Sequence, residues 1–230
     1  QIHGDGDWMY RQPRLQPGGW AYQKFNSRYP DIDDTAMVLE GLAGTNRHVE
    51  HDIREAISSG TNWMIGMQNS DGGFSAWEKD TPVFMQELFA LSQGMDVLID
   101  PSEADVTARV IRALVALKRL EPSLNRAVLD RSIERACTWL IGKAQWEDSA
   151  QVWIGDWAIN RAYGTAEVVT ALLESRCWWH YSEAGPSVRW LANLQNADGG
   201  WGESPESYLV GRFVPAASTA DLTGFVLNAL

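Results

Sequence analysis

Four similar octapeptides that read as helix starts recur along the chain, and their spacing constrains the fold more than any other feature. Each begins with threonine followed by alanine or glycine, continues with a largely apolar run and ends in leucine. They are Thr35–Leu42, Thr107–Leu114, Thr165–Leu172 and Thr223–Leu230, with the threonines 72, 58 and 58 residues apart. A recurrence of this length is typical of stacked helical units, none of which can bury its apolar face alone.

A second kind of helix alternates with the first and ends in a glycine turn. Trp63–Phe74 and Trp190–Trp201 match almost position for position, and a degraded third copy runs from Trp139 to near Trp153. In the two clean copies a helical pattern reaches glutamine, and Asn-x-Asp-Gly-Gly then stops the helix. We expect the glutamine to bond free backbone groups there and the final aromatic ring to fold back on the helix end. These segments are predicted to be structural staples.

The pattern predicts an all-α fold, because alternation of period two is scarce. The predicted helices are residues 34–45, 51–68, 103–119, 128–143, 165–176, 186–196 and 219–230. The threonine-started helices are apolar nearly all round, as Val110, Ile111 and Leu114 illustrate, so they are expected to form the inner of two concentric layers. The segment 75–101 has no clear helical pattern and is expected to shape a cavity mouth or a membrane-facing loop.

Composition narrows the possible partners. The chain has 19 lysines and arginines against 30 acidic residues, a net charge of −11, and no basic stripe for a phosphate backbone. Nucleic acid is therefore not an expected partner. No apolar run approaches the length of about 18 residues that a membrane span needs, although a surface patch could still contact a bilayer. Cys137 and Cys177 lie in separate apolar helical stretches and are expected to be buried thiols rather than a disulfide.

The acid cluster Asp31-Ile32-Asp33-Asp34 precedes the first threonine helix and is the strongest candidate for chemistry. One carboxylate is enough to cap a helix N-terminus, so the other two need different partners. Asp31 and Asp34 are predicted to share one face while Asp33 points elsewhere. On residue type alone, a cluster that only over-provides the cap stays open.

Carboxyl groups this close together titrate apart, so one of them can stay protonated near neutrality. The aromatic-rich run Gly18–Phe25 would place rings beside such an acid. A proton donor facing a dry cavity can protonate a carbon–carbon double bond, and aromatic faces stabilise the carbocation by roughly 0.5–2 kcal/mol each. This chemistry is acid-initiated cationic cyclisation. The residues two before each threonine are expected to face one common site: Asp33, Asp105, Tyr163 and Asp221.

The chain resembles the class II triterpene cyclases, most closely the squalene–hopene cyclases. The resemblance rests on Gly18–Ala36, which contains Asp-x-Asp-Asp-Thr-Ala, and on the staples Gln68–Phe74 and Gln195–Trp201. Matches continue through Asp100–Ala108 and Trp157–Thr165 and cover essentially the whole chain. The resemblance implies an (α/α) barrel (toroid), the catalytic one of the family's two. Residues 1–230 would then be a partial barrel domain, truncated at both ends and stopping within the fourth repeat.

The resemblance also implies a reaction and its residues. Asp33 would protonate a terminal alkene of squalene on the way to hopene or hopanol, a step of hopanoid biosynthesis that uses no metal and no cofactor. The implied catalytic group is Asp33, Asp31, Asp34, Asp105 and Arg109, and the implied cavity aromatics are Tyr22, Trp77, Trp157 and Tyr163. The resemblance further implies an apolar isoprenoid substrate, peripheral attachment to the cytoplasmic side of a bacterial-type cell membrane, and a homodimer as the candidate oligomer.

Two departures from the family pattern affect the candidate site, while Phe74, which replaces a staple tryptophan, and the degraded third staple concern stability. Arg109 stands where well-known bacterial members carry a histidine that tunes the acid. An arginine is permanently charged and pairs well with carboxylates, so we expect it to anchor one aspartate as an anion and leave Asp33 protonated. Lys24 stands where the family usually has an aromatic residue, so one cavity wall is expected to be altered.

Several alternatives remain open. The first is a cyclase for another isoprenoid, either a prenylated aromatic or a diterpene diphosphate, whose phosphates would want basic residues such as Lys24 and Arg28 at the cavity mouth. A prenyltransferase-like zinc site is disfavoured, because no histidine follows a cysteine with ligand spacing. A non-catalytic α-solenoid binding module would explain the repeats but not three aspartates beside an aromatic run.

Overall fold

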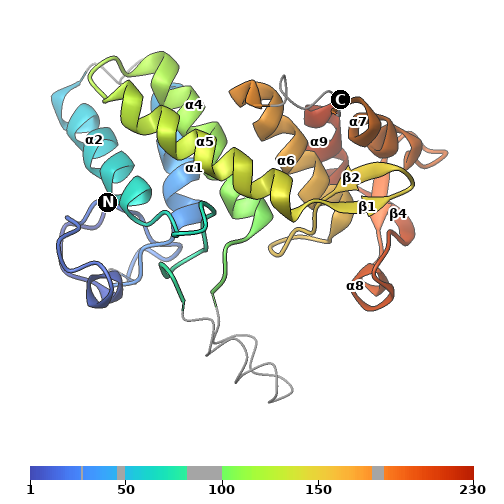
Figure 1. Cartoon of the computed structure of the whole chain (residues 1–230), viewed down its shortest axis with the longest axis horizontal. Helices are drawn as coiled ribbons and strands as arrows, with labels where there is room; N and C mark the ends of the chain where they lie inside the picture. The colour runs from blue at the N-terminus through green and yellow to red at the C-terminus, as the bar shows by residue number, and fades with distance from the viewer. Residues whose placement is uncertain (27, 46–49, 82–99, 178–183) are drawn as a thin grey trace.

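The four threonine motifs lie in the first turns of four helices that form one layer (Figure 1). The computed structural model describes residues 1–26, 28–45, 50–81, 100–177 and 184–230. The inner helices are α1 (Ile32–Ala43), α4 (Ala104–Leu120), α6 (Arg161–Ser175) and α9 (Ala220–Ala229). They pack side by side in chain order, α1 against α4, α4 against α6 and α6 against α9. The repeat in the sequence is therefore a repeat in space.

The second kind of helix forms an outer layer. It consists of α2 (His51–Gly66), α5 (Arg126–Lys143) and α7 (Ala184–Asn193). Each outer helix packs mainly on the inner helix that precedes it in the chain: α2 on α1, α5 on α4 and α7 on α6. All seven predicted helices are thus confirmed, with ends that differ by a few residues. Closure of this two-layered arc into a full barrel remains a prediction.

Short elements complete the described part of the chain. They are the 3-10 helix η1 (Asp7–Tyr10), the helix α8 (Glu206–Val210), and the strands β1 (Gln145–Glu147), β2 (Ala150–Val152), β3 (Trp201–Glu203) and β4 (Pro215–Thr219). The strands form two antiparallel ribbons, β1 with β2 and β3 with β4. The fold is mostly helical, as expected, but the two ribbons were not anticipated because strands this short carry too few residues for a period-two pattern.

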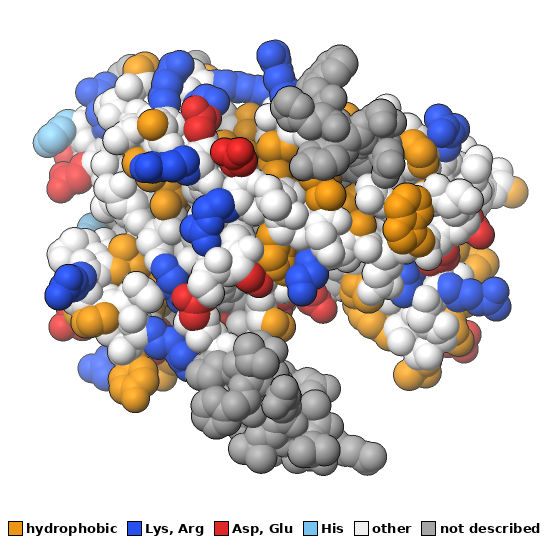
Figure 2. All heavy atoms as spheres, in the orientation of Figure 1, with side chains coloured by type: hydrophobic (Ala, Val, Ile, Leu, Met, Phe, Trp, Pro, Cys, Tyr) orange, Lys and Arg blue, Asp and Glu red, His pale blue; other side chains and the backbone are white. Residues whose placement is uncertain are grey.

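The two middle helices of the inner layer, α4 and α6, are the most buried, because each has an inner helix on either side and an outer helix against it. Every residue of α6 from Arg161 to Leu172 is buried, and on α4 the apolar residues Val110, Ile111 and Leu114 are fully enclosed. Over the outer face shown in Figure 2, acidic and basic side chains are interspersed, with hydrophobic ones scattered among them. Polar groups on the inner helices are therefore exceptions that need a reason.

The first staple is confirmed as a structural device. Gln68, just beyond α2, donates through Nε2 to the carbonyl of Gly72 at 2.8 Å and to that of Ser132 at 2.9 Å. Ser132 belongs to α5, so this glutamine ties one outer helix to the next. Gly72 lies in the turn that follows α2 and has φ of +103°, a conformation that favours glycine.

The aromatic ends of the staples fold back as expected. Trp201 donates through Nε1 to the carbonyl of Leu191 in α7 at 2.7 Å. Trp153 makes the same bond to the carbonyl of Leu140 in α5, also at 2.7 Å. The degraded third copy therefore keeps the hydrogen bond from the indole to the helix end. Both indoles are buried, and each closes a helix end by satisfying a carbonyl that lacks an intrahelical partner.

The expectation for the cysteines is wrong. Cys137 of α5 and Cys177, which follows α6, form a disulfide with their Cα atoms 6.4 Å apart. They are 40 residues apart in sequence, and no sequence pattern indicates that the two helical stretches meet. The α5 helix packs against α6, which brings the Cα atoms within the range that a disulfide requires.

Most of the segment 75–101 lies outside the described residues, so the expected cavity mouth or membrane-facing loop at 82–99 is not part of this description. Its described start, residues 75–81, is a loop without helix. Within the described ranges no helix combines the length and apolarity needed to cross a bilayer.

Candidate active site

Asp31 performs the capping task at the N-terminus of α1. One of its side-chain oxygens, Oδ1, accepts the backbone N–H of Asp33 at 2.8 Å and that of Asp34 at 3.1 Å. One carboxylate thus satisfies two of the orphan donors of the first turn. Asp31 is thus a helix N-cap, and the side chains of Asp33 and Asp34 are not needed for capping.

Asp33 pairs across the inner layer with Arg109 of α4. The guanidinium donates through Nη1 to Asp33 Oδ2 at 2.5 Å, and the two side chains are only 16% and 17% exposed. The other oxygen, Oδ1, is buried and has no hydrogen-bond partner among the described residues. An ionised Asp33 would therefore have one strong partner and one desolvated oxygen without any.

Arg109 does not do what the sequence led us to expect. It was expected to anchor a different aspartate and leave Asp33 free, but its ion pair is with Asp33 itself. The same guanidinium donates through Nη2 to the hydroxyl of Tyr163 in α6 at 2.7 Å. The reason is position: Asp33, Arg109 and Tyr163 all lie in the N-terminal parts of neighbouring inner helices, so the long arginine spans the gap between α1 and α6.

All three aspartates line one cavity of about 760 Å³. The prediction that Asp33 would point away from Asp31 and Asp34 is therefore wrong, although the three do have different hydrogen-bond partners. The remaining lining residues are mainly aromatic or neutral: Tyr22, Gln23, Asn26, Tyr29, Met37, Trp77, Arg109 and Trp157. Three of the four predicted aromatics, Tyr22, Trp77 and Trp157, thus contact the same space as the acid cluster.

Trp77 and Trp157 form an aromatic pair on this cavity. Their ring centroids are 5.2 Å apart and their planes are at 79°, an edge-to-face arrangement. Both rings remain partly exposed, at 39% and 47%. They come from loops rather than helices, so other groups must fix them.

Three carboxyl groups hold these two tryptophans. Asp100 accepts the backbone N–H groups of residues 76–78, including Trp77 at 2.7 Å. Buried Asp105 accepts the backbone N–H groups of Asp156 and Trp157, each at 3.0 Å. Glu103 accepts the indole N–H of Trp157 at 2.6 Å. Asp105 was predicted to belong to the site's hydrogen-bond network, and its observed task is to fix the Trp157 loop.

Glu103 and Asp100 are site residues that the sequence reasoning missed as individuals. Both lie within the stretch Asp100–Ala108 that resembles the family, so a signal was present. The sequence does not indicate where the loops that carry Trp77 and Trp157 lie relative to these two acids. Neither loop has a periodic pattern from which its position over α4 could be predicted.

The acids around the cavity have raised proton affinities. Desolvation by burial raises the pKa of Asp33 to about 6 against the opposing effect of Arg109, and burial likewise raises the pKa of Asp31 to about 6. Burial raises the pKa of Asp34 as well, and that of Glu103 to about 9. A substantial protonated fraction near neutrality is the property that a carboxylic proton donor needs.

Tyr163, the fourth predicted aromatic, is fully buried and lies behind the main cavity. Its ring is edge-to-face with Phe225 of α9, with centroids 4.9 Å apart. Both rings line a smaller cavity of about 290 Å³, which shares Trp157 with the main one and also contacts Asp221. The four positions before the threonines therefore divide between the two cavities and the Trp157 loop that separates them.

The carboxylates Glu103, Asp105 and Asp156 offer oxygens within 4.8 Å of one another, a spacing that a cation could bridge. Asp105 and Glu103 already accept hydrogen bonds from the Trp157 loop, as described above. In the described part of the chain no cysteine or histidine joins this group. Its evident task is to hold the loop.

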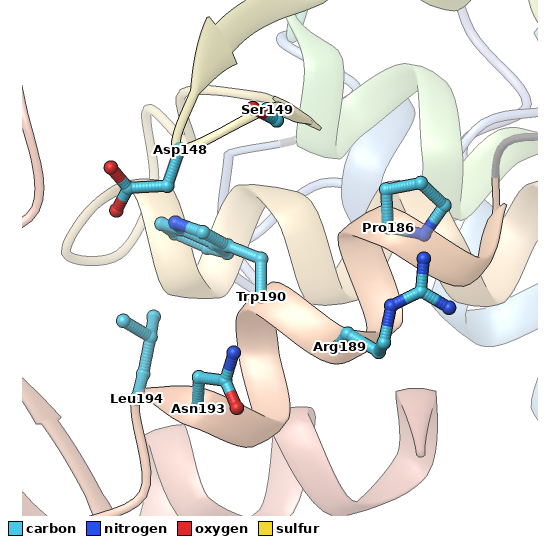
Figure 3. A pocket seen from close by; sticks show the side chains of 7 residues that line it. All are labelled: Asp148, Ser149, Pro186, Arg189, Trp190, Asn193 and Leu194. Carbon is cyan, nitrogen blue, oxygen red and sulfur yellow. The ribbon is translucent and has the colours of Figure 1, made fainter.

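A further pocket of about 410 Å³ lies on the outer layer, between the β1–β2 turn and α7 (Figure 3). Trp190 of α7 reaches from the helix towards the turn that carries Asp148. Asp148 is exposed and is the one carboxylate among the lining residues, all of them described. None of the predicted site residues contacts this pocket, so it is not the candidate active site.

The fold and the site together define a class: helical repeats that place a buried carboxylic acid against an aromatic-lined cavity. Comparison with known proteins agrees with it. The profile of the squalene-hopene cyclase C-terminal domain matches residues 1–230. The chain belongs to this family of class II terpene cyclases.

Individual relatives show the same likeness. The chain is 33% identical to a squalene–hopene cyclase of Zymomonas mobilis over 98% of its own length and 33% of the relative's. It is 34% identical to one from Bradyrhizobium diazoefficiens, over 100% and 34% of the two lengths. The enfumafungin synthase of Hormonema carpetanum is 35% identical over 98% of this chain and 17% of that protein. The chain spans about a third of the length of the two squalene–hopene cyclases.

Proposed function

We propose that this chain supplies the proton-donating part of a cyclase that converts squalene to hopene or hopanol. Asp33 is the general acid, and Asp31, Asp34 and Arg109 set its environment. Asp105 fixes the Trp157 loop. Tyr22, Trp77 and Trp157 stabilise the carbocations, with Tyr163 supporting Arg109. The complete protein is proposed to close the two-layered arc into an (α/α) barrel.

The observation that carries the proposal is the position of Asp33. This carboxyl is largely buried, its pKa is raised to about 6, and it lines the same 760 Å³ cavity as the edge-to-face pair Trp77–Trp157. A proton transferred to an alkene in this cavity leaves an Asp33 anion that Arg109 already contacts. The nascent cation meets aromatic faces, each worth roughly 0.5–2 kcal/mol.

A direct experiment tests the proposal. The complete polypeptide that contains this chain is incubated with squalene in detergent, and the products are separated by gas chromatography with mass spectrometry. We expect pentacyclic products from the wild type and none above background from Asp33→Asn. Asp148→Asn, an exposed aspartate on the unrelated outer pocket, serves as the matched control and should retain wild-type activity. A wild type that leaves squalene unchanged would contradict the proposal.

A cyclase for another isoprenoid is the second candidate, and the relatives motivate it. They include the enfumafungin synthase and a terpene cyclase–glycosyl transferase fusion protein of Humicola fuscoatra, 34% identical over 98% of this chain. The described cavity argues against a diphosphate substrate. Its one basic lining residue, Arg109, is paired with Asp33, and Arg28 lines a neighbouring pocket together with Asp5 and Asp7. Lys24 is exposed and lies over the ring of Phe25.

The same assay separates these candidates. Geranylgeranyl diphosphate and a prenylated phenol are offered under the conditions used for squalene. Turnover of one of them in place of squalene identifies the second candidate. A chain that binds none and turns over none fits the α-solenoid binding module instead.

Squalene is an apolar hydrocarbon that partitions into lipid, so we also propose that the complete protein contacts a membrane peripherally, on the cytoplasmic side. Flotation with vesicles of mixed phosphatidylglycerol and phosphatidylethanolamine tests this, and protein that stays at the bottom of the gradient contradicts it. The homodimer remains a prediction, to be checked by light scattering in detergent.

A further inference from the structure

A ladder of alternating charges crosses the inner layer beneath the acid cluster. It joins three helices, each contributing two residues: Asp33 and Glu40 from α1, Arg109 and Arg112 from α4, and Glu167 and Glu174 from α6. Much of α4 and α6 is buried and apolar, so charges placed between these helices carry a desolvation cost. Glu167 lies at the centre of the ladder.

Glu167 is the most deeply buried member. Its side chain is 3% exposed, and its Oε2 atom lies 3.6 Å from Arg109 Nε and 3.6 Å from Arg112 Nη1. That oxygen has no hydrogen-bond partner among the described residues. Glu167 is therefore held by two ion pairs rather than by hydrogen bonds. Removing the charge of Glu167 is therefore expected to change the electrostatic environment of both arginines.

Glu167 completes the set of contacts around the Arg109 guanidinium. Nη1 donates to Asp33, Nη2 donates to Tyr163, and Nε faces Glu167. A planar guanidinium with all three nitrogens engaged has a fixed orientation. Asp33 and Glu167 thus lie against the same cation, one from α1 and the other from α6.

This arrangement has an electrostatic consequence. A lone arginine on a carboxylate stabilises the anion and so weakens the acid's hold on its proton. A second carboxylate on the same guanidinium offsets part of that positive charge. Asp33 is also faced by Asp31 and Asp34 on its own helix, by Asp105 on α4, and by Tyr163 on α6. Because none of these other groups carries a positive charge, Arg109 is the cation whose charge must be balanced.

We propose that Glu167 is a positioning residue for proton donation: it fixes Arg109 and offsets its charge, so that Arg109 orients Asp33 without removing its proton. The inference rests on the proposed function of Asp33 as the acid. It assigns to this chain a carboxylate partner for the arginine that replaces the histidine of well-known bacterial family members.

The test is Glu167→Gln in the complete polypeptide, with two readouts. The first follows the carboxyl stretching bands by infrared spectroscopy as a function of pH, with Asp33→Asn subtracted to isolate Asp33. The second is the pH profile of squalene cyclisation. We expect the titration of Asp33 to move down by about one pH unit, which lowers kcat about tenfold at pH 7 and little at pH 5. KM should stay unchanged, because Glu167 does not contact the cavity.

Two comparisons make the test specific. Glu174→Gln removes a carboxylate from the same helix that lies 3.9 Å from Arg112 Nε, and it should leave both readouts at wild-type values. In an Arg109→Gln background, Glu167→Gln should shift the titration of Asp33 less, since only the direct repulsion between the two carboxylates remains. Glu167→Asp keeps the charge and should keep the wild-type titration, which shows that a shift in Glu167→Gln comes from the lost charge.

The outcomes are distinguishable. An Asp33 titration that is the same in wild type and Glu167→Gln overturns the inference, and so does a shift of the same size in the Arg109→Gln background. A wild type inert on squalene overturns the proposed function instead. In that case the infrared titration still decides whether Glu167 controls the proton of Asp33.

Discussion

Asp31 accepts the backbone N–H of Asp33 through Oδ1 at 2.8 Å. The two carboxyl groups of one motif therefore have different tasks: the first closes the helix end, and the second is directed to Arg109 on the neighbouring helix. Because the cap is supplied by Asp31, the side chain of Asp33 makes no capping hydrogen bond at the helix start. It can be changed without removing the cap.

This division predicts different effects of two amide substitutions on activity. Asparagine is as good an N-cap as aspartate, so Asp31→Asn should fold and keep part of the cyclisation rate. Asp33→Asn removes the general acid, and the rate should fall by about 10² to 10⁴. Initial rates of product formation at pH 6 measure both. Equal losses in the two variants would show that Asp33 has no special role.

The raised pKa of Asp33 predicts the pH dependence of the reaction. The protonated form is the active one, and its pKa is about 6. We therefore expect kcat/KM to be level on the acid side of pH 6 and to fall about tenfold per unit above it. Asp31 also titrates with a pKa of about 6, so the observed midpoint belongs to the pair. A rate that rises from pH 6 to pH 8 would exclude Asp33 as the donor.

The same shift predicts that the acid destabilises the fold at high pH. The pKa of Asp33 is above its ordinary value of 3.8, because burial disfavours the charged form. Its contribution to stability is therefore fully present below pH 4 and is lost as pH rises through about 6. Asp33→Asn should raise the free energy of unfolding at pH 8 by up to roughly 3 kcal/mol and change little at pH 4. Thermal unfolding at the two pH values measures this, with exposed Asp148→Asn expected to show no such difference.

The sequence allowed the helices to be predicted well, because the repeat constrains them twice, through period 3.6 and through the spacing of the threonines. The stop signals at Gln68 and Gln195 worked for a physical reason. The Asn-x-Asp-Gly-Gly turn that follows each glutamine leaves the helical direction, with a glycine at positive φ in both copies, Gly72 and Gly199. The capping role within Asp31–Asp34 also followed from local chemistry alone.

Relations between elements were harder to predict. Arg109 was expected to pair with another aspartate, and only the packing of α1 on α4 shows that it reaches Asp33. The Cys137–Cys177 disulfide and the contact of Glu103 with Trp157 likewise depend on which loops and helix ends meet. Such tertiary contacts depend on side-chain size and on the angles at which helices pack, and a single sequence carries no periodic signal for either.

The pair Trp77–Trp157 predicts an effect on the products rather than on folding alone. Trp157 is partly exposed to the cavity and is held by Glu103 through its indole N–H. Trp157→Ala removes an aromatic face worth roughly 0.5–2 kcal/mol to a cation, so complete cyclisation should slow about 2- to 30-fold. Because intermediates then survive longer, the share of partly cyclised products should rise. Trp157→Phe keeps an aromatic ring, so its rate and its share of partly cyclised products should lie between those of the wild type and Trp157→Ala.

The product profile by mass spectrometry, normalised to squalene consumed, distinguishes this role from a general loss of stability. Trp146→Ala is the matched control, because Trp146 is 66% exposed on β1 and does not line the cavity. It should leave both rate and product ratio at wild-type values. If Trp157→Ala slows the reaction but gives wild-type product ratios, the ring acts only by shaping the cavity, and stabilisation of a cation by Trp157 is excluded.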